Sequence, residues 1–275
     1  MSEIAPSAVF QRDRLYTSVA LAVIVVLAWA YVISFAGGMS DTPTAASGMD
    51  DMGPMAAAAP QIAAWSSAEF VLLASMWIAM MIGMMTPSAT PMILLYARVG
   101  RSAATQGKPF ASTAWFAGGY LLAWSAFAIV ATGAQWLLEQ AALLSPMMIT
   151  TSPILGGAIL ILAGLYQWAP LKNACLAACR APLSFIQHHG GFQRHAAGAI
   201  RLGLQHGLYC IGCCWALMAL LFVGGVMNPL WIAGIATLVL VEKLTPGVWW
   251  IPKAAGLALI AAGASMVVVS FMSSA

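Results

Sequence analysis

Long apolar segments dominate the chain, and they limit what it can fold into. Of its 275 residues, 62% are hydrophobic and only 7% are charged, whereas about a quarter of a soluble domain is charged. A helix of about 20 apolar residues crosses a bilayer. We therefore expect an all-α, polytopic transmembrane helical bundle of about seven spans. The candidate spans are Leu15–Ala36, Glu69–Tyr96, Ala111–Leu138, Ser152–Trp168, Leu204–Val226, Pro229–Val241 and Ala254–Met272.

The first of these segments resembles a signal peptide only in part. Leu15–Ala36 is longer than the usual apolar region of a signal peptide, and the following "ISFAGGMSD" matches a cleavage site only loosely. We expect it to be retained as the first helix, whereas the short sixth segment is the least clearly defined span.

Charge indicates the orientation of the spans, because cytoplasmic loops carry an excess of lysine and arginine. With seven spans, all eleven basic residues fall on one side of the membrane. The loops on the other side hold acidic residues but no lysine or arginine. We therefore expect a cytoplasmic N-terminus and an exterior C-terminus. The net charge of +3 is explained by topology, and no nucleic-acid partner is expected.

Three regions follow from this organisation. Residues 1–36 form a cytoplasmic leader and the first helix, residues 37–68 a flexible exterior loop, and residues 69–275 a six-helix transmembrane core. The loop is rich in methionine and aspartate, and thioethers are soft ligands that suit Cu(I) outside the cell. The loop is also explained as a simple linker with incidental methionines. Its relevant residues are Met39, Asp41, Met49, Asp50, Asp51, Met52 and Met55.

The longest cytoplasmic connection spans residues 169–201. Its apolar and basic residues predict a short amphipathic helix on the inner membrane surface, followed by a glycine-rich turn. Cys175 and Cys179 are four residues apart, which places both thiols on one face of a helix.

The segment "HGLYCIGCCWALM" concentrates soft ligands within an apolar helix. At about 100° per residue, His206, Cys210, Cys213 and Cys214 share an arc of about 100°. Such ligands suit Cu(I), Zn(II) or an iron–sulfur cluster. A single free cysteine is more often a small buried packing residue. Three within five positions, after a histidine, favour a metal site.

A second group of soft ligands lies in "MWIAMMIGMMTPSATPM". Met80 and Met84 follow one helical line, and Met81 and Met85 lie beside it. Methionine usually fills gaps in a core, but this density favours ligands. Depth estimates put Met84 and Met85 about 20 Å from the cytoplasmic end and the cysteines about 14 to 20 Å from it. A mixed thiolate and thioether site is therefore geometrically possible.

Two prolines and three charged residues complete the candidates. Pro87 and Pro91 are expected to kink or break their helix, with nearby hydroxyls compensating freed backbone groups. Glu242 is a functional candidate as an acid within a span, and Lys243 beside it is also explained as a lysine extending to the membrane surface. Lys172 could instead neutralise Glu242 or favour a thiolate.

These motifs together resemble a family of bacterial inner-membrane proteins that are uncharacterised and predicted to bind metal. The resemblance spans about Ser66 to Lys253 and rests on the MMxxMMxP and GCCW motifs, on "YQWAPLKNACLAACRAPLSF" and on "VEKLTPG". It implies a multi-pass protein of the bacterial inner (cytoplasmic) membrane. The ligands it implies are Met80, Met81, Met84, Met85, Cys175, Cys179, Cys210, Cys213 and Cys214.

The leading hypothesis is soft-metal handling, with Cu(I) as the expected metal and zinc as an alternative. An importer, a metal-delivery factor and a sensor all fit, with the lipid bilayer, a soluble metal-binding protein or a membrane complex as partners. A second hypothesis is a membrane thiol–disulfide oxidoreductase that uses Cys210 and Cys213, although these lie toward the reducing side. A third is a structural subunit of a membrane complex. Catalytic triads and paired-carboxylate sites are not visible, so hydrolysis is not expected.

Overall fold

The computed structural model describes residues 6–40, 65–145, 148–245 and 247–274. Within these ranges the protein is helical, and its β-structure is limited to one bridge between Leu144 and Thr150. The helices are α1 (Pro6–Ser40), α2 (Ser67–Thr105), α3 (Thr113–Gln140), α4 (Pro153–Tyr166), α5 (Pro170–Arg180), α6 (Pro182–His188), α7 (Ala196–Ala219), α8 (Leu221–Gly224), α9 (Pro229–Leu244) and α10 (Trp250–Ser274).

Several of these helices have the length and composition of membrane spans. Among the described residues, five segments qualify as candidate spans: α1, α2, α3, the α7–α8 segment and α10. A sixth candidate results if α4 and α5, which are bent by 63° relative to each other, form one broken span. The helix at the expected sixth span, α9, has only 16 residues, fewer than the roughly 20 that cross a bilayer. The all-helical, membrane-compatible fold is confirmed, while seven spans and a cytoplasmic N-terminus stay predictions.

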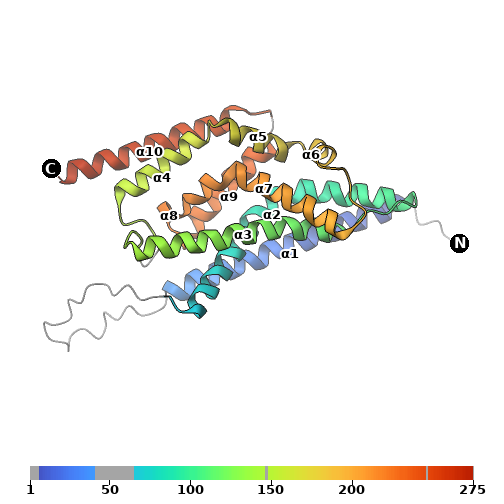
Figure 1. Cartoon of the computed structure of the whole chain (residues 1–275), viewed down its shortest axis with the longest axis horizontal. Helices are drawn as coiled ribbons and strands as arrows, with labels where there is room; N and C mark the ends of the chain where they lie inside the picture. The colour runs from blue at the N-terminus through green and yellow to red at the C-terminus, as the bar shows by residue number, and fades with distance from the viewer. Residues whose placement is uncertain (1–5, 41–64, 146–147, 246, 275) are drawn as a thin grey trace.

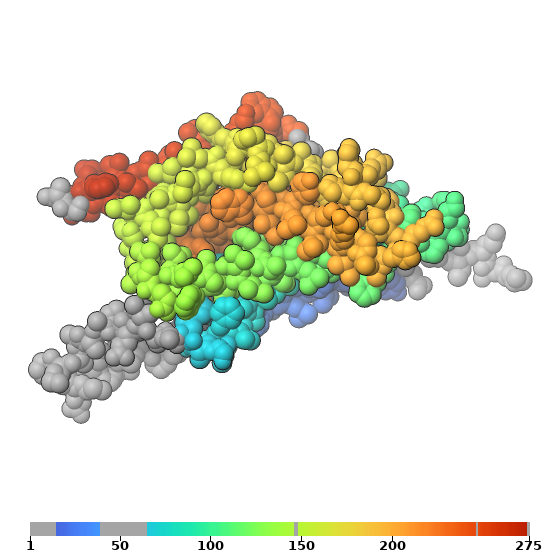
Figure 2. Space-filling model, in the orientation of Figure 1, coloured from blue at the N-terminus to red at the C-terminus, as the bar shows by residue number. Residues whose placement is uncertain are grey.

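The two chain termini lie at opposite ends of the long axis (Figure 1). Helices α1, α2 and α3 form one side of the bundle, α4 and α10 form the other, and α7, α8 and α9 lie between them. In the space-filling view, α7 is visible between α3 and the α4–α5 segment (Figure 2). Helix α7 thus packs against α3 and α5, of which α5 carries the other two cysteines.

Glycines allow two helix pairs to approach very closely. Along α3 and α7, a Cβ on Gly119 would meet the Ile200 carbonyl, and one on Gly203 would meet the Phe116 carbonyl. The α4–α10 pair has the same arrangement, since a Cβ on Gly164 would lie 2.6 Å from the Gly256 carbonyl oxygen. Small residues of this kind allow van der Waals packing of backbones inside membranes.

Helix α2 begins at a capping box and continues through both prolines. The Ser66 side chain accepts from the Glu69 amide, and the Glu69 carboxylate accepts from the Ser66 amide. Pro87 and Pro91 lie inside the uninterrupted helix, so the expected break does not occur.

The hydroxyls near these prolines do not compensate the freed carbonyls. A helical proline leaves the carbonyl four residues earlier without its usual donor, here those of Gly83 and Pro87. The hydroxyls of Thr86, Ser88 and Thr90 donate instead to the carbonyls of Ile82, Met85 and Thr86.

The connection over residues 169–201 differs from the single surface helix that we expected. It forms two helices, α5 and α6, and then a turn at Gly190 and Gly191, both of which have positive φ. Helix α5 buries Lys172, Cys175 and Leu176. It therefore belongs to the core of the protein, because its partners are α7 and α9.

Candidate metal centre

The three cysteines of α7 are all buried, with 0% to 2% of each residue exposed. The Sγ atoms of Cys213 and Cys214 each donate to the Cys210 carbonyl oxygen at 3.0 Å. Thus both thiols turn back along the helix toward the turn that carries Cys210.

Helix α5 brings the other two cysteines to α7. The Cys179 thiol lies close to the thiols of Cys210 and Cys213. The Cys175 sulfur lies at Gly212, 2.7 Å from where a Cβ would be, so only glycine leaves room for it. We call Cys179, Cys210, Cys213 and Cys214 the thiol cluster. The expected common face of Cys175 and Cys179 is therefore directed at α7.

A lysine is the closest cation to this cluster. The Lys243 Nζ donates to the Cys210 sulfur at 2.7 Å and to the Ser88 hydroxyl at 3.0 Å. The residue is only 6% exposed, so the interpretation of Lys243 as a lysine extending to the membrane surface is wrong. It turns inward because Cys210 and Ser88 supply acceptors there, whereas the neighbouring Glu242 carboxylate binds another lysine.

That other lysine is Lys172 on α5. Its Nζ lies 2.6 Å from the Glu242 Oε2 atom, and both side chains are almost completely buried. Arg180 donates twice to the Glu242 carbonyl oxygen, at 2.6 and 2.8 Å. These contacts fasten α5 to the end of α9. They hold Cys179 against α7.

Tyr120 of α3 connects the thiols with α2. Its hydroxyl donates to the Met85 carbonyl at 3.0 Å and lies 3.1 Å from the Cys210 sulfur. The expected overlap in depth between Met85 and Cys210 is therefore observed. Sequence reasoning missed Tyr120, although a tyrosine within an apolar helix signals a buried hydroxyl that needs a partner.

The four candidate methionines of α2 are buried but lie on two faces. Trp77, Met81 and Met85 are successive turns of one face, which we call the α2 stripe. The Trp77 side chain is directed toward α3, because its Nε1 donates to Gln135, and the backbone carbonyl of Met85 accepts from Tyr120 of the same helix. Met80 instead lines a small apolar hollow with residues of α1 and α9. Met84, one turn later, lies between Met80 and Ser88, on the side toward α9.

His206 lies in an aromatic environment one turn before Cys210. It is 3% exposed, and the rings of Tyr120 and Phe185 have centroids 5.7 and 5.2 Å from its own. Its Nδ1 has no hydrogen-bond partner. In the described part of the chain, no group of three or more His, Cys, Asp or Glu side chains is arranged to hold a metal ion. The segment with Met49, Met52 and Met55 lies outside the described residues, as does the Met39 side chain.

The comparisons with known proteins identify the family. The model of the PpoB2 family, described as a copper chaperone, matches residues 74–266. The chain belongs to this family. The match contains the thiol cluster, Lys243 and the α2 methionines and leaves out α1. No curated protein and no solved structure matches the chain. As a member of a copper chaperone family, the protein has a copper-related function, which agrees with the metal-binding role implied by the sequence motifs.

Proposed function

We propose that the protein is a multi-pass protein of the bacterial inner membrane that binds Cu(I) at the thiol cluster and delivers it to a partner. The observation that carries this proposal is the group of three buried α7 thiols with the half-buried Cys179 of α5 close to them and an ammonium 2.7 Å from one sulfur. The family supports copper as the cargo. Thiolate sulfur is a soft ligand that Cu(I) prefers.

Charge supports Cu(I) bound by two thiolates. Such a complex carries one negative charge, and an uncompensated charge is unfavourable in a low-dielectric interior. The Lys243 ammonium lies where it balances that charge. Cys210 and Cys179 are the pair that we favour, because they lie on different helices and are already in contact.

The α2 methionines provide the weaker ligands that delivery requires. Met85 lies at the level of Cys210, since Tyr120 contacts both residues. Thioethers carry no charge, so a Cu(I) ion that moves to them loses the electrostatic attraction of a thiolate. We propose that Met81, Met84 and Met85 exchange the ion with the thiol cluster, and that His206 adds a nitrogen ligand from the adjacent turn.

Elemental analysis with copper-edge X-ray absorption on the purified protein under reducing conditions tests this function. We expect the wild type to hold copper with sulfur ligands. A variant with Cys210, Cys213 and Cys214 all changed to serine should lose most of it. Ala216→Ser, which adds a hydroxyl to a buried position of the same helix, serves as the control and should keep it. Equal copper content in wild type and triple variant would overturn the proposal.

A further inference from the structure

A second group of potential ligand atoms lies at the C-terminal end of α3. The Gln135 Nε2 atom donates to the Glu139 Oε1 atom at 2.8 Å and to the Met148 sulfur at 3.3 Å. The other Glu139 oxygen accepts from the Trp65 indole at 2.8 Å. A carboxylate oxygen and a thioether sulfur thus converge on a single nitrogen. We call Gln135, Glu139 and Met148 the Glu139 cluster.

The carboxylate and the thioether in this cluster are held ready for a cation. Among the described residues, Glu139 forms no ion pair, and its hydrogen-bond donors are neutral. Met148 adopts φ of 56°, a left-handed conformation that costs a non-glycine residue about 1 to 2 kcal/mol. Met148 is buried in this conformation, and its sulfur accepts a hydrogen bond from Gln135.

The α2 stripe connects this cluster with the thiol cluster. At one end, the Trp77 Nε1 donates to the Gln135 Oε1 at 2.6 Å. At the other end, Tyr120 joins Met85 to Cys210. Met81 lies on the turn between Trp77 and Met85, so thioether sulfur is present between the two clusters.

We propose that Glu139 and Met148 form an outer binding site for a monovalent soft cation, with Gln135 as a positioning residue. The site rests on the proposed function, because it gives Cu(I) a first contact on the route toward the thiols. One carboxylate and one neutral thioether balance a single positive charge, whereas a divalent ion would keep an excess charge. The ion would lie between the Glu139 oxygen and the Met148 sulfur, beside the Gln135 amide that holds both acceptors in place.

The test uses Ag(I) as the probe, since it is monovalent and soft and undergoes no redox change during titration. The starting variant has all five cysteines changed to serine and the exterior-loop methionines changed to leucine, which removes the competing thiols of α5 and α7 and the thioethers of the loop. We expect this protein to bind Ag(I) in a calorimetric titration. Met148→Leu and Glu139→Gln should each weaken that binding at least tenfold. The altered methionines are Met39, Met49, Met52 and Met55.

Met266→Leu is the matched control, because its thioether lies against Gly156 in the α4–α10 pair, away from the Glu139 cluster. It should leave the Ag(I) affinity unchanged. Absence of Ag(I) binding in the starting variant, or equal affinities in all variants, overturns the outer site. Those results leave the proposed function intact if changing the three α7 cysteines to serine still removes most of the copper that the wild type holds. Glu139→Gln keeps the size of the side chain, so it decides the outcome if Met148→Leu fails to fold.

Discussion

At the scale of single residues, the unusual feature is the burial of charge between α5, α7 and α9. Lys172 and Glu242 neutralise each other, and the Lys243 ammonium is directed at the Cys210 sulfur. Breaking a buried ion pair by removing one partner leaves an uncompensated charge and destabilises a protein by about 3 to 5 kcal/mol. The Lys172–Glu242 pair is therefore expected to hold α5, and Cys179 with it, in place.

We predict that Lys172→Met lowers the thermal unfolding midpoint and also reduces copper content, since Glu242 loses its partner and α5 loosens. The double variant Lys172→Met with Glu242→Leu removes both charges and should recover most of the stability. Arg180 binds the backbone of residue 242, so this contact survives in both variants. Similar midpoints for the wild type and the single variant would show that the ion pair does not hold α5.

At the scale of elements, the fold depends on glycines that bring helix backbones together. The α3–α7 pair matters most for function, because α3 provides Tyr120 and α7 provides the cysteines. A larger residue at this contact would separate the two helices and move Tyr120 away from Cys210. Gly118 and Gly119 are neighbours in sequence, but only a Cβ on Gly119 would meet the α7 backbone.

Alanine substitutions at these two glycines should therefore have opposite effects. Gly119→Ala is expected to lower the thermal midpoint, because its methyl group would overlap the Ile200 carbonyl. Gly118→Ala has open space around its Cβ and should be neutral or stabilising, since alanine is favoured over glycine in helices by about 1 kcal/mol. Equal midpoints for the two variants, measured in the same detergent, would contradict this account of the helix contact.

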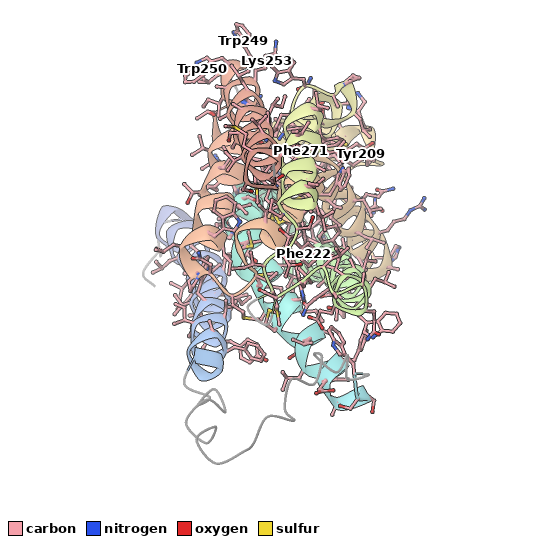
Figure 3. All side chains as sticks on the ribbon, turned by 90° about the vertical axis from the view of Figure 1, so that its left-hand side faces the viewer. Tyr209, Phe222, Trp249, Trp250, Lys253 and Phe271 are labelled. Atoms are coloured by element: carbon pink, nitrogen blue, oxygen red, sulfur yellow. The ribbon has the colours of Figure 1, made fainter. Side chains whose placement is uncertain are left out.

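At the scale of the whole molecule, the positions of the two ends of the chain bear on the number of membrane crossings. The termini lie at opposite ends of the bundle (Figure 1), as an odd number of crossings requires. Viewed along the long axis, Trp249, Trp250 and Lys253 lie together at one edge of the α10 side (Figure 3). Both tryptophans are exposed, which is typical of side chains at a membrane–water interface.

We predict that fusions to the two ends of the chain report opposite sides of the membrane. Alkaline phosphatase depends on disulfides that form outside the cytoplasm, so it should be active at the C-terminus and inactive at the N-terminus. Green fluorescent protein, as a cytoplasmic reporter, should give the reverse pattern. Activity of the same reporter at both ends would mean an even number of crossings and would contradict the seven-span topology.

Local periodicity and composition were enough to predict much of the protein. The apolar segments predicted an all-helical chain with membrane-length helices, and the spacing of Cys210, Cys213 and Cys214 predicted that they could share a helix face. The methionines at Met84 and Met85 were expected at the depth of these thiols, and the Tyr120 contacts agree with that depth. Such predictions succeed because a helix repeats every 3.6 residues whatever surrounds it.

Only the tertiary structure decided which helix faces meet. Lys243 reaches Cys210 across 33 positions of sequence, and Tyr120 reaches Cys210 across 90. The pairing of Lys172 with Glu242, across 70 positions, was one of two alternatives that the sequence offered for Lys172, and the structure confirms it. The same holds for the Glu139 cluster, whose sulfur comes from a loop. Periodicity orients a side chain about its own helix axis, but its partner depends on how glycines and buried charges pack that helix against the others. For this reason the sequence by itself determined which helix faces carry thiols and thioethers, whereas tertiary packing determined the lysine and the tyrosine beside the thiols.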